Sequence, residues 1–519
     1  MQLNCTVTHK IDIMNKIGFR NFRRFTDFKP IEFKGLTFLV GKNNSGKSTL
    51  VKALLLIIDY LKADTLKTLS FNQNNIEDVN IVTFERALNK RAKLNKEEFI
   101  EFILEINGLR FHLTITGKEH STEVDVINLS IDDISGGFLF TIKPQENSVT
   151  ISNNSEGIEI IPENEENLLI ELEDKKTEIT NGLKGIKQKS SQEYIQLNNE
   201  LKQIKKKIAD LRKSIKSTLR AGQFTLHSHY SYTTLKDVLQ EAVTEHSAEY
   251  EVQYHEIQKG KKPKKIFELL KAFKDSKFKI EKSISSILEF KNQVENVYLG
   301  ATLNKQSALF AIRDKRNPLA QAIHEYKQLG IDKDQGNDAF KFVRKWTKEA
   351  EFEIGDSFEI DMHAGEAYEV LVNSHGLKIP LADKGMGSIQ AMLLIIRLAV
   401  IIHKKETNKK GYTIIIEEPE LNLHPALQSK LAEMFHEVYK IHGISFIVET
   451  HSEYVIRKTQ ILVKLNEYEV APNENPFAVL YFDKRLNQWN MNYREDGRFK
   501  ESFGEGFFDE SANLTFELL

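Results

Sequence analysis

Nine consecutive residues near the start of the chain have the types and spacing needed to hold a row of phosphate groups. The segment reads Gly41, Lys42, Asn43, Asn44, Ser45, Gly46, Lys47, Ser48 and Thr49. In such a G-x-x-x-x-G-K-[ST] loop, backbone N–H groups of a tight turn and of a helix N-terminus point at the phosphates, and the lysine adds charge. Ser48 offers a hydroxyl to Mg²⁺. Because apolar runs flank the loop at 36–40 and 50–58, we predict a site for a nucleoside triphosphate and Mg²⁺.

Two adjacent carboxylates end an apolar strand later in the chain. The β-branched run 412–416 is followed by Glu417 and Glu418, and Pro419 stops the strand. A buried parallel strand carries such acids to the edge of the sheet where ligands bind in open α/β folds. We predict that Glu417 helps to hold Mg²⁺ and that Glu418 polarises the attacking water as general base. The alternative is a strand followed by an acidic turn without a catalytic role.

Two further stretches could contact a nucleotide. Gly385, Gly387 and Ser388 precede an apolar helix predicted for 391–403, and small residues at a helix N-terminus form a second anion site. One nucleotide does not need two such sites, unless the second serves the nucleotide of a partner subunit. The other stretch is a buried strand that ends on His451, which could hydrogen-bond the γ-phosphate. Taken alone, a histidine in this place is also explained by a structural role.

The elements that must position these residues fall into two strand-containing blocks. In the first block, strand-like runs alternate with the helix that follows the phosphate loop, and a compact, strand-rich pattern returns near residue 340. The runs of the first block are 16–25, 31–40, 99–106, 109–116 and 138–142. The strands of the first block are expected to form half of a nucleotide-binding sheet. We therefore predict an α/β fold in which residues 1–160 and 336–519 form the two halves of one nucleotide-binding domain, with a helical insertion over 161–335.

The insertion contains two helical patterns. Apolar residues recur at alternating steps of three and four through 194–215, which predicts a helix with one packing stripe, as in a short coiled coil. A weaker pattern over 168–186 is interrupted near Asn181 and at Gly182 and Gly185. Together they predict a helical hairpin inserted into the nucleotide-binding domain. Two helices of an ordinary helical subdomain are the alternative.

Positive charge gathers in the same insertion. Residues 184–216 contain ten Lys or Arg against three acids, a net of +7, and residues 259–282 have the same balance. Nucleic acid or an acidic partner protein could dock on such segments. The alternative is a solvated helix face, which charge runs commonly form.

Composition narrows the class of protein. The 519 residues are 40% hydrophobic and 28% charged with a formal net charge of −2, which is typical of a soluble globular protein without overall attraction to nucleic acid. Cys5 is the single cysteine, so neither an internal disulfide nor a cysteine-based zinc site is expected, and a reducing cytoplasm fits. The apolar stretch 391–402 is too short to span a bilayer and contains Arg397, which predicts a buried helix and no membrane partner.

The order of these motifs resembles the ABC class of ATPases, in the branch shared with chromosome-maintenance and recombination ATPases. More narrowly, residues 22–25, 416–425 and 449–452 resemble AAA ATPases of the OLD type found in bacterial phage-defence systems, such as the ATPase subunits of PARIS or Septu. The tail 505–510 is similar to one seen in many of those proteins. The resemblance covers about residues 14–60 and 378–519.

The resemblance implies an ABC-type ATPase head with ATP and Mg²⁺ as cofactors, in which Lys47 and Ser48 hold phosphates and metal and Arg23 lies near the nucleotide. Residues 385–388 would be a signature motif that closes over ATP bound by a second subunit, giving a head-to-tail dimer. His451 would be the switch histidine. Glu417 replaces an aspartate common in transporter ATPases, although glutamate is familiar in the OLD-like branch. Gln73 is only a candidate for the Q-loop glutamine, since neighbouring asparagines suggest a plain loop.

These features favour an ATP-hydrolysing regulatory subunit of an anti-phage complex that controls a nuclease partner. OLD-type proteins often carry a nuclease domain, but the 68 residues after His451 contain one plausible strand and no Asp-x-Asp pair, so we expect none here. One alternative is a DNA-repair or recombination ATPase that binds DNA through the Lys-rich insertion. Another is a scaffold that binds ATP and scarcely hydrolyses it. A transporter ATPase is disfavoured by the large insertion.

Overall fold

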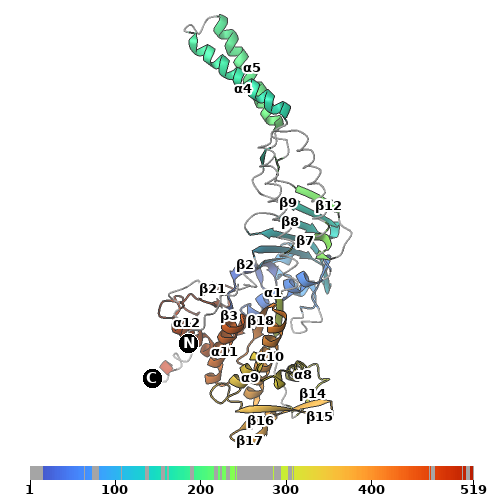
Figure 1. Ribbon diagram of the computed structural model, residues 1–519, viewed down its shortest axis with the longest axis vertical. Helices are drawn as coiled ribbons and strands as arrows, with labels where there is room; N and C mark the ends of the chain where they lie inside the picture. Colours follow the sequence, from blue (N-terminus) through green and yellow to red (C-terminus); the bar gives the residue numbers. More distant parts are fainter. Residues whose placement is uncertain are drawn as a thin grey trace.

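Segments from both ends of the sequence build one body, which lies at one end of the long axis of the molecule. A helical hairpin lies at the other end of that axis (Figure 1). The computed structural model describes residues 16–63, 65–72, 81–106, 108–134, 139–152, 158–159, 163–186, 192–215, 220–221, 225–229, 234–235, 237–239, 241, 285, 294–301, 307, 309–466, 468, 474–504, 507–509 and 515–517. The candidate Gln73 and the basic segment 259–282 lie outside these residues.

A six-stranded sheet forms the centre of this body. Its order is β13-β18-β19-β3-β20-β21, and every neighbouring pair is parallel except the last. The strands are β13 (Val294–Leu299), β18 (Gly411–Glu417), β19 (Ser445–Thr450), β3 (Leu36–Gly41), β20 (Phe477–Phe482) and β21 (Gln488–Asn490). Strands β3, β18 and β19 are buried almost throughout, as expected for β-branched and apolar runs covered on both faces. Their carboxyl ends therefore meet at one edge of the sheet.

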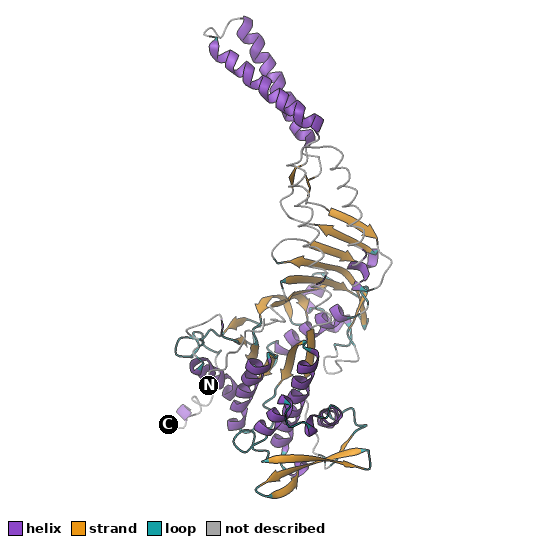
Figure 2. Ribbon diagram, in the orientation of Figure 1, coloured by secondary structure: helices purple, strands orange, loops and turns teal. Residues whose placement is uncertain are grey.

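Helices cover both faces of the parallel sheet (Figure 2). Ile415 and Ile447 face α1 (Lys47–Lys62), whereas Ile414 and Val448, one residue away on the same strands, belong to the cluster on the other face. That second face packs against α8 (Pro318–Gln328), α9 (Asp338–Trp346), α10 (Met386–Asn408), α11 (Pro425–His442) and α12 (Glu453–Leu465). The alternation of strand side chains thus gives the domain two apolar layers.

Helix α10 is apolar around most of its circumference because it is buried among other helices. Within the part of the chain that the structure describes, it is the one helix long and apolar enough to cross a membrane. Of its most apolar 18-residue stretch, 72% is buried inside the protein. Arg397, inside this helix, points its guanidinium at Glu325 (3.4 Å) and at the carbonyl of Pro318 (3.2 Å). The burial agrees with the prediction of a core helix in this stretch.

A second, antiparallel sheet of nine strands lies on the other side of α1. Its order is β12-β9-β8-β7-β6-β5-β1-β2, with β4 paired to β7. The strands are β1 (Lys16–Phe22), β2 (Phe25–Glu32), β4 (Thr68–Ser70), β5 (Ile100–Ile106), β6 (Leu109–Thr116), β7 (Glu123–Asp133), β8 (Leu139–Lys143), β9 (Ser148–Ser152) and β12 (Thr225–His229). Short helices α2 (Phe84–Ala87) and α3 (Lys90–Leu94) lie between β4 and β5 in the chain. Apolar residues of α1 and of this sheet form one cluster, so α1 is held between two sheets.

This sheet corrects the expectation that the strands before residue 160 form half of the nucleotide-binding sheet. Of those strands only β3 joins the parallel sheet, and the others are antiparallel. The strand expected over 31–40 is two strands, because the chain turns at 33–35 between β2 and β3. At Gly35 a Cβ would lie 2.1 Å from the ring of Tyr439, so a larger residue does not fit there.

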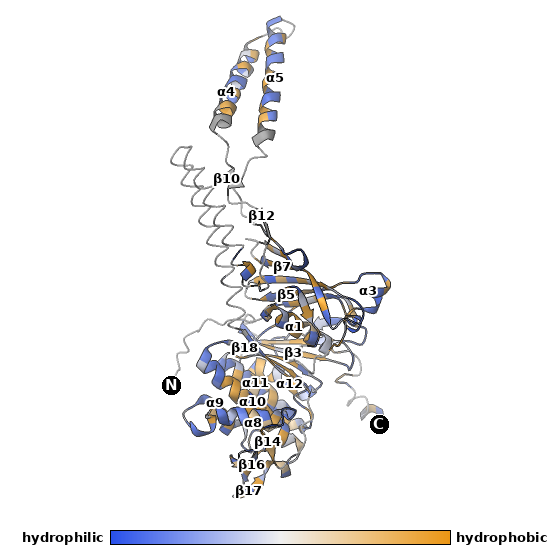
Figure 3. Cartoon of the chain, turned by 90° about the vertical axis from the view of Figure 1, so that its right-hand side faces the viewer, coloured by the Kyte–Doolittle hydropathy of each residue, from blue (hydrophilic) through white to orange (hydrophobic). Residues whose placement is uncertain are grey.

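Helices α4 (Glu163–Gly185) and α5 (Gln192–Ile215) form the hairpin. Their apolar residues face each other, and Ile179, Leu201, Ile204 and Ile208 are buried between them. Figure 3 shows apolar residues interspersed with polar ones along both helices, as one shared stripe requires. A helical hairpin was expected here, and its description as a coiled coil stays a prediction. Two-residue strands β10 (Ile158–Glu159) and β11 (Arg220–Ala221) pair on either side of the hairpin in the sequence.

A small sheet lies at the end of this body that is farthest from the hairpin (Figure 1). It comprises β14 (Phe310–Ala311), β15 (Ser357–His363), β16 (Ala367–Ser374) and β17 (Leu377–Pro380). Strand β13 and helix α8 fall inside the range 161–335, yet they pack in the central sheet and its helical layer. A division of the chain that assigns residues from about 294 onward to the ATPase body therefore describes these contacts better, and the domain limits remain a proposal.

Candidate functional site

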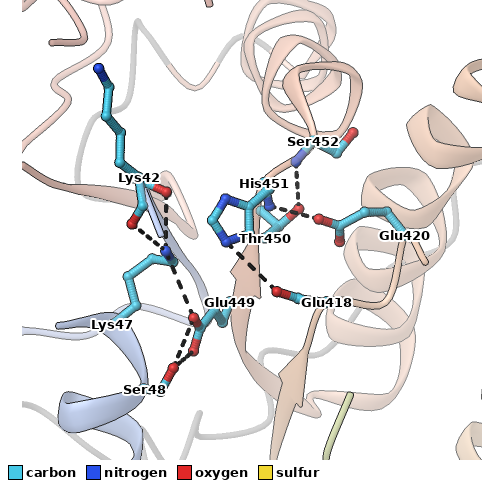
Figure 4. A network of polar contacts seen from close by, with 10 residues as sticks. Lys42, Lys47, Ser48, Glu418, Glu420, Glu449, Thr450, His451 and Ser452 are labelled. Atoms are coloured by element: carbon cyan, nitrogen blue, oxygen red, sulfur yellow. Dashed lines mark hydrogen bonds and ion pairs between the residues drawn. The ribbon is translucent and has the colours of Figure 1, made fainter. Parts of the chain in front are cut away.

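The predicted catalytic segments meet because three neighbouring strands end together. In the parallel register, Glu417 of β18 lies opposite Glu449 of β19, and Thr450 lies opposite Val40 of β3. The phosphate loop follows β3 directly, and His451 follows β19. The strand order β18-β19-β3 therefore brings together segments that are far apart in the sequence (Figure 4).

The two glycines of the phosphate loop are required by its shape. Gly41 has a φ of +146°, and a Cβ there would lie 2.2 Å from the carbonyl oxygen of Phe482. Gly46 has a φ of +109°, and a Cβ there would lie 2.4 Å from the ring of Phe25. Helix α1 begins immediately after Gly46, so its free N–H groups face the loop. A helix N-terminus in this position favours an anion such as phosphate.

Lys47 is buried and already directed into the loop. Its side chain is 3% exposed. The Nζ atom donates to the carbonyl oxygens of Gly41 (3.0 Å) and Lys42 (3.1 Å). Burial lowers the pKa of Lys47, and the charges of Glu449, Glu418 and other nearby carboxylates oppose that shift. The ammonium is thus held where the predicted phosphates would bind.

Glu449 is a central residue of the site, although sequence reasoning assigned it no role. Its carboxylate lies between Lys47 and Ser48 (Figure 4), with both oxygens 3.1 Å from Ser48 Oγ and one of them 3.8 Å from Lys47 Nζ. Burial raises the pKa of Glu449 to about 7; the charge of Glu417 adds to the rise, whereas Lys47 and the Ser48 hydroxyl oppose it. The available signal was a carboxylate at the end of an otherwise apolar strand.

Glu418 adopts a backbone conformation that is unusual for its residue type. Its φ of +47° lies in the left-handed region. Its N–H donates to the carbonyl oxygen of Glu449 at 2.8 Å, which holds the turn after β18 against β19. Left-handed backbone at a residue with a side chain costs on the order of 1 kcal/mol and persists where surrounding contacts impose it. The turn directs the Glu418 carboxylate toward His451.

His451 is held by two of the acids that follow β18. Its backbone N–H donates to Glu420 Oε1 at 2.6 Å, and its Nε2 lies 3.7 Å from Glu418 Oε1. Burial lowers the pKa of His451 to about 4, and the charge of Lys47 acts in the same direction. The imidazole is therefore neutral near pH 7 and has both a donor and an acceptor nitrogen. Burial raises the pKa of the Glu420 carboxyl.

The predicted residues at the start of α10 contact the loop after β18, and their described contacts do not include the phosphate loop. Gly385 has a φ of +76° at the start of α10, and a Cβ on Gly387 would lie 2.8 Å from the carbonyl oxygen of Asn422, in the loop that follows the Glu417–Glu420 segment. Among the described residues, the side-chain hydrogen bonds and ion pairs of the phosphate loop reach Glu449 and the loop itself, and none reaches Gly385, Gly387 or Ser388.

Arg23 lies in the turn between β1 and β2, next to the phosphate loop. Its N–H donates to the carbonyl of Ala87 at 2.6 Å, and its own carbonyl accepts from the Asn89 side chain at 2.8 Å. Two residues further on, Phe25 contacts Gly46. The turn is thus fixed beside the loop, and burial together with the nearby charge of Arg86 lowers the pKa of Arg23.

The oxygen donors at this edge fit Mg²⁺. They are the Ser48 hydroxyl and the carboxylates of Glu417 and Glu449, all of the hard-ligand type that Mg²⁺ prefers. Within the described ranges there is no cluster of three or more His, Cys, Asp or Glu side chains that could hold a metal ion alone. In nucleotide sites Mg²⁺ is usually held by one or two carboxylates together with substrate phosphates.

A parallel sheet with a phosphate loop after one strand and acids after its neighbours defines an α/β P-loop ATPase. A family model for the AAA ATPase domain matches residues 13–456, and the chain belongs to this family. The predicted class of fold is thereby confirmed, and membership of this family implies that the nucleotide is ATP. The finer assignment to phage-defence ATPases stays a prediction.

The chain is also similar to Smc proteins. The chromosome partition protein Smc of Methanocaldococcus jannaschii is 26% identical over 242 residues, which cover 37% of this chain and 19% of that protein. The chain thus matches about a fifth of that relative's length. The Smc head domain of Pyrococcus furiosus, solved with an extended coiled coil and bound to the C-terminal domain of ScpA, aligns over 98% of this chain and 99% of that chain at 12% identity and a TM-score of 0.33. The SMC head domain of Thermotoga maritima aligns over 90% and 94% at 10% identity and a TM-score of 0.29.

Proposed function

We propose that this chain is an ATP-hydrolysing switch whose catalytic site is completed by a second copy of the chain. The observation that carries the proposal is the convergence of Lys47, Ser48, Glu418 and His451 at one edge of the parallel sheet, where Glu449 contacts the first three of these residues. A phosphate-binding lysine, a metal-binding hydroxyl and an acid placed to orient water are the parts that phosphoryl transfer needs.

Each residue has a distinct role in this proposal. Lys47 and the N–H groups of the loop bind the phosphates, while Ser48 and Glu417 hold Mg²⁺, which neutralises charge on the phosphates when bound. Glu418 accepts a proton from the attacking water or orients it, and its strained turn fixes the carboxylate in direction. The neutral His451 hydrogen-bonds the terminal phosphate and reports its presence to Glu418.

The second copy supplies the other half of the site. Residues Gly385, Gly387 and Ser388 open α10 with small side chains at a helix N-terminus, yet their described contacts are not with the chain's own phosphate loop. In a head-to-tail dimer they bind the ATP held by the partner, so turnover requires association. Gly387 rests on the loop that follows the Glu417–Glu420 segment, which gives a path from the partner's nucleotide to the chain's own acids.

The switch acts, in this proposal, within a cytoplasmic anti-phage complex and controls an effector, most simply a nuclease. The support is the resemblance of residues 22–25, 416–425 and 449–452 to OLD-type ATPases. ATP favours the closed dimer, and a change in nucleotide state reopens it. The effector responds only if it contacts the two states differently, because a ligand shifts an equilibrium by its difference in affinity.

ATP turnover by Glu418→Gln tests the core of the proposal. Replacing the general base should lower kcat by roughly 10²- to 10⁴-fold while nucleotide binding persists. Glu453→Gln is the matched control, because Glu453 is a half-exposed residue of α12 that pairs with Arg457 at 3.1 Å. Specific activity should also rise with protein concentration, as a dimeric site requires. Wild-type protein without turnover, or equal turnover in both variants, would contradict the enzyme assignment.

A DNA-binding ATPase of repair or recombination is the second candidate. The similarity to a chromosome partition protein favours it, and so does the row of exposed lysines on α5 at 202 and 205–207. Binding of duplex DNA at several salt concentrations separates the two candidates. Tight binding with a steep salt dependence favours the DNA-binding ATPase, because each neutralised phosphate releases counterions.

A further inference from the structure

Glu449 has contacts that no role in the proposed mechanism yet explains. It stands 401 residues after Ser48 in the sequence, and both of its carboxylate oxygens lie 3.1 Å from the Ser48 hydroxyl. The residue is 5% exposed, so its charge is placed in the protein interior at considerable cost unless it is compensated. Its backbone carbonyl also holds the N–H of Glu418.

A simple ion pair with Lys47 does not account for this position. The Lys47 ammonium donates its hydrogen bonds to the carbonyls of Gly41 and Lys42, and its 3.8 Å separation from Glu449 is longer than a hydrogen bond. The closest partner of the carboxylate is instead the Ser48 hydroxyl. That hydroxyl is the group of the phosphate loop that binds metal.

The charge balance around Ser48 points the same way. Glu417 lies opposite Glu449 in the register of β18 and β19, and both Glu418 and Glu449 lie close enough to Lys47 to act on its charge. When ionised, these three carboxylates outweigh the single ammonium by two charges. Such a site repels a polyphosphate and attracts a divalent cation.

We propose that Glu449 is an additional carboxylate of the Mg²⁺ site, which binds the hydrated metal held by Ser48 and Glu417 and sets how strongly nucleotide binding depends on Mg²⁺. This inference rests on the proposed function, since it concerns the same nucleotide site. It adds Glu449 to the metal-binding residues. The sequence motifs by themselves predict only Ser48 and Glu417 for that role.

The test compares binding of a non-hydrolysable ATP analogue, AMP-PNP, with Mg²⁺ and with EDTA. Glu449→Gln should weaken binding with Mg²⁺ and tighten binding with EDTA, because it removes a metal-binding charge and a repulsive charge at once. The ratio of the two affinities should fall by roughly ten- to a hundredfold. Titration of Mn²⁺ with bound AMP-PNP, followed by electron paramagnetic resonance, should show a matching loss of metal affinity.

Three variants make the comparison specific. Glu417→Gln should reduce the ratio like Glu449→Gln. Glu453→Gln is the matched control, because it removes one carboxylate charge from a residue of α12 that pairs with Arg457 at 3.1 Å, so its ratio should stay near that of the wild type. Glu449→Asp keeps the charge and shortens the side chain, and it should lower Mn²⁺ affinity even if Glu449→Gln fails to fold.

The outcomes distinguish this inference from the proposed function. If the wild type binds AMP-PNP with a strong Mg²⁺ dependence and the Glu449 variants keep that dependence, the inference is wrong and the proposed function stands. Equal weakening with Mg²⁺ and with EDTA would likewise overturn it, because that pattern indicates a structural role. A wild type that binds no nucleotide in either medium would overturn both.

Discussion

The carboxyl edge of the parallel sheet and the α4–α5 hairpin use charge in opposite ways. At the sheet edge, Lys47 and Glu449 are buried within a few ångströms of each other, and backbone groups hold them in place. On the hairpin, one apolar stripe is buried, and the lysines at 202 and 205–207 are exposed to solvent. Buried charge is specific in geometry and expensive to disturb, whereas exposed charge is adaptable and screened by salt. This difference favours the sheet edge, with its fixed charges, as the place of the proposed chemistry.

Lys47→Ala should produce the largest effect, and it tests the claim that buried charge carries the chemistry. Loss of a buried charge partner costs about 2–5 kcal/mol, which corresponds to roughly thirty- to several-thousandfold weaker nucleotide binding. Isothermal titration with AMP-PNP and Mg²⁺ measures it. Lys42→Ala serves for comparison, because its ammonium points away from the other labelled side chains in Figure 4, and its loss should be much smaller. Similar losses in the two variants would show that the burial of Lys47 does not set its contribution to nucleotide binding.

The loop and acids of the site could be predicted from the sequence because their signals are local. A glycine-rich loop after an apolar run and two glutamates after another place Lys47, Glu417 and Glu418 at strand ends without any knowledge of strand order. His451 follows the same rule. The contact of Glu449 with Ser48 could not be predicted this way, because it depends on β19 lying between β18 and β3. Strand order is decided by tertiary packing.

The antiparallel sheet was missed for a related reason. Strand β6 alternates buried and half-exposed residues along its whole length, which indicates a sheet with one covered face. That alternation is present in the sequence, but the nearness of these strands to the phosphate loop in the chain favours a place in the nucleotide-binding sheet. Strand β13 gave a weaker signal, since it is short and follows a Lys-rich segment. Its place beside β18 is set by pairing with a strand more than 110 positions away.

Ile204→Ala should have an intermediate effect and tests whether the hairpin is energetically separate from the site. Ile204 is 6% exposed between α4 and α5, and truncation of a buried isoleucine costs about 2–5 kcal/mol. In this small cluster we expect the lower end of that range. Hydrogen exchange should quicken across 163–215 while ATP turnover is unchanged. Ile195→Ala, at a position that is 52% exposed, is the control. A fall in turnover for Ile204→Ala but not for Ile195→Ala would instead show that the hairpin and the site are energetically coupled.

The smallest expected effect is on the pH dependence of stability, and it concerns a buried histidine of the ATPase body. His436 of α11 is buried against Phe477, its Nε2 lies 3.0 Å from the Tyr468 hydroxyl, and burial lowers its pKa from 6.5 to about 4. The unfolded chain therefore binds a proton that the folded chain does not, and stability is lost as pH falls from about 6.5 toward 4. At pH 5 the loss is about 2 kcal/mol relative to pH 8, from 1.36 kcal/mol per pH unit.

His436→Gln keeps a hydrogen-bonding group for Tyr468 without titrating, so urea unfolding at the two pH values should show a smaller loss than in the wild type. Equal losses would mean that the acid sensitivity of this body arises from other buried groups.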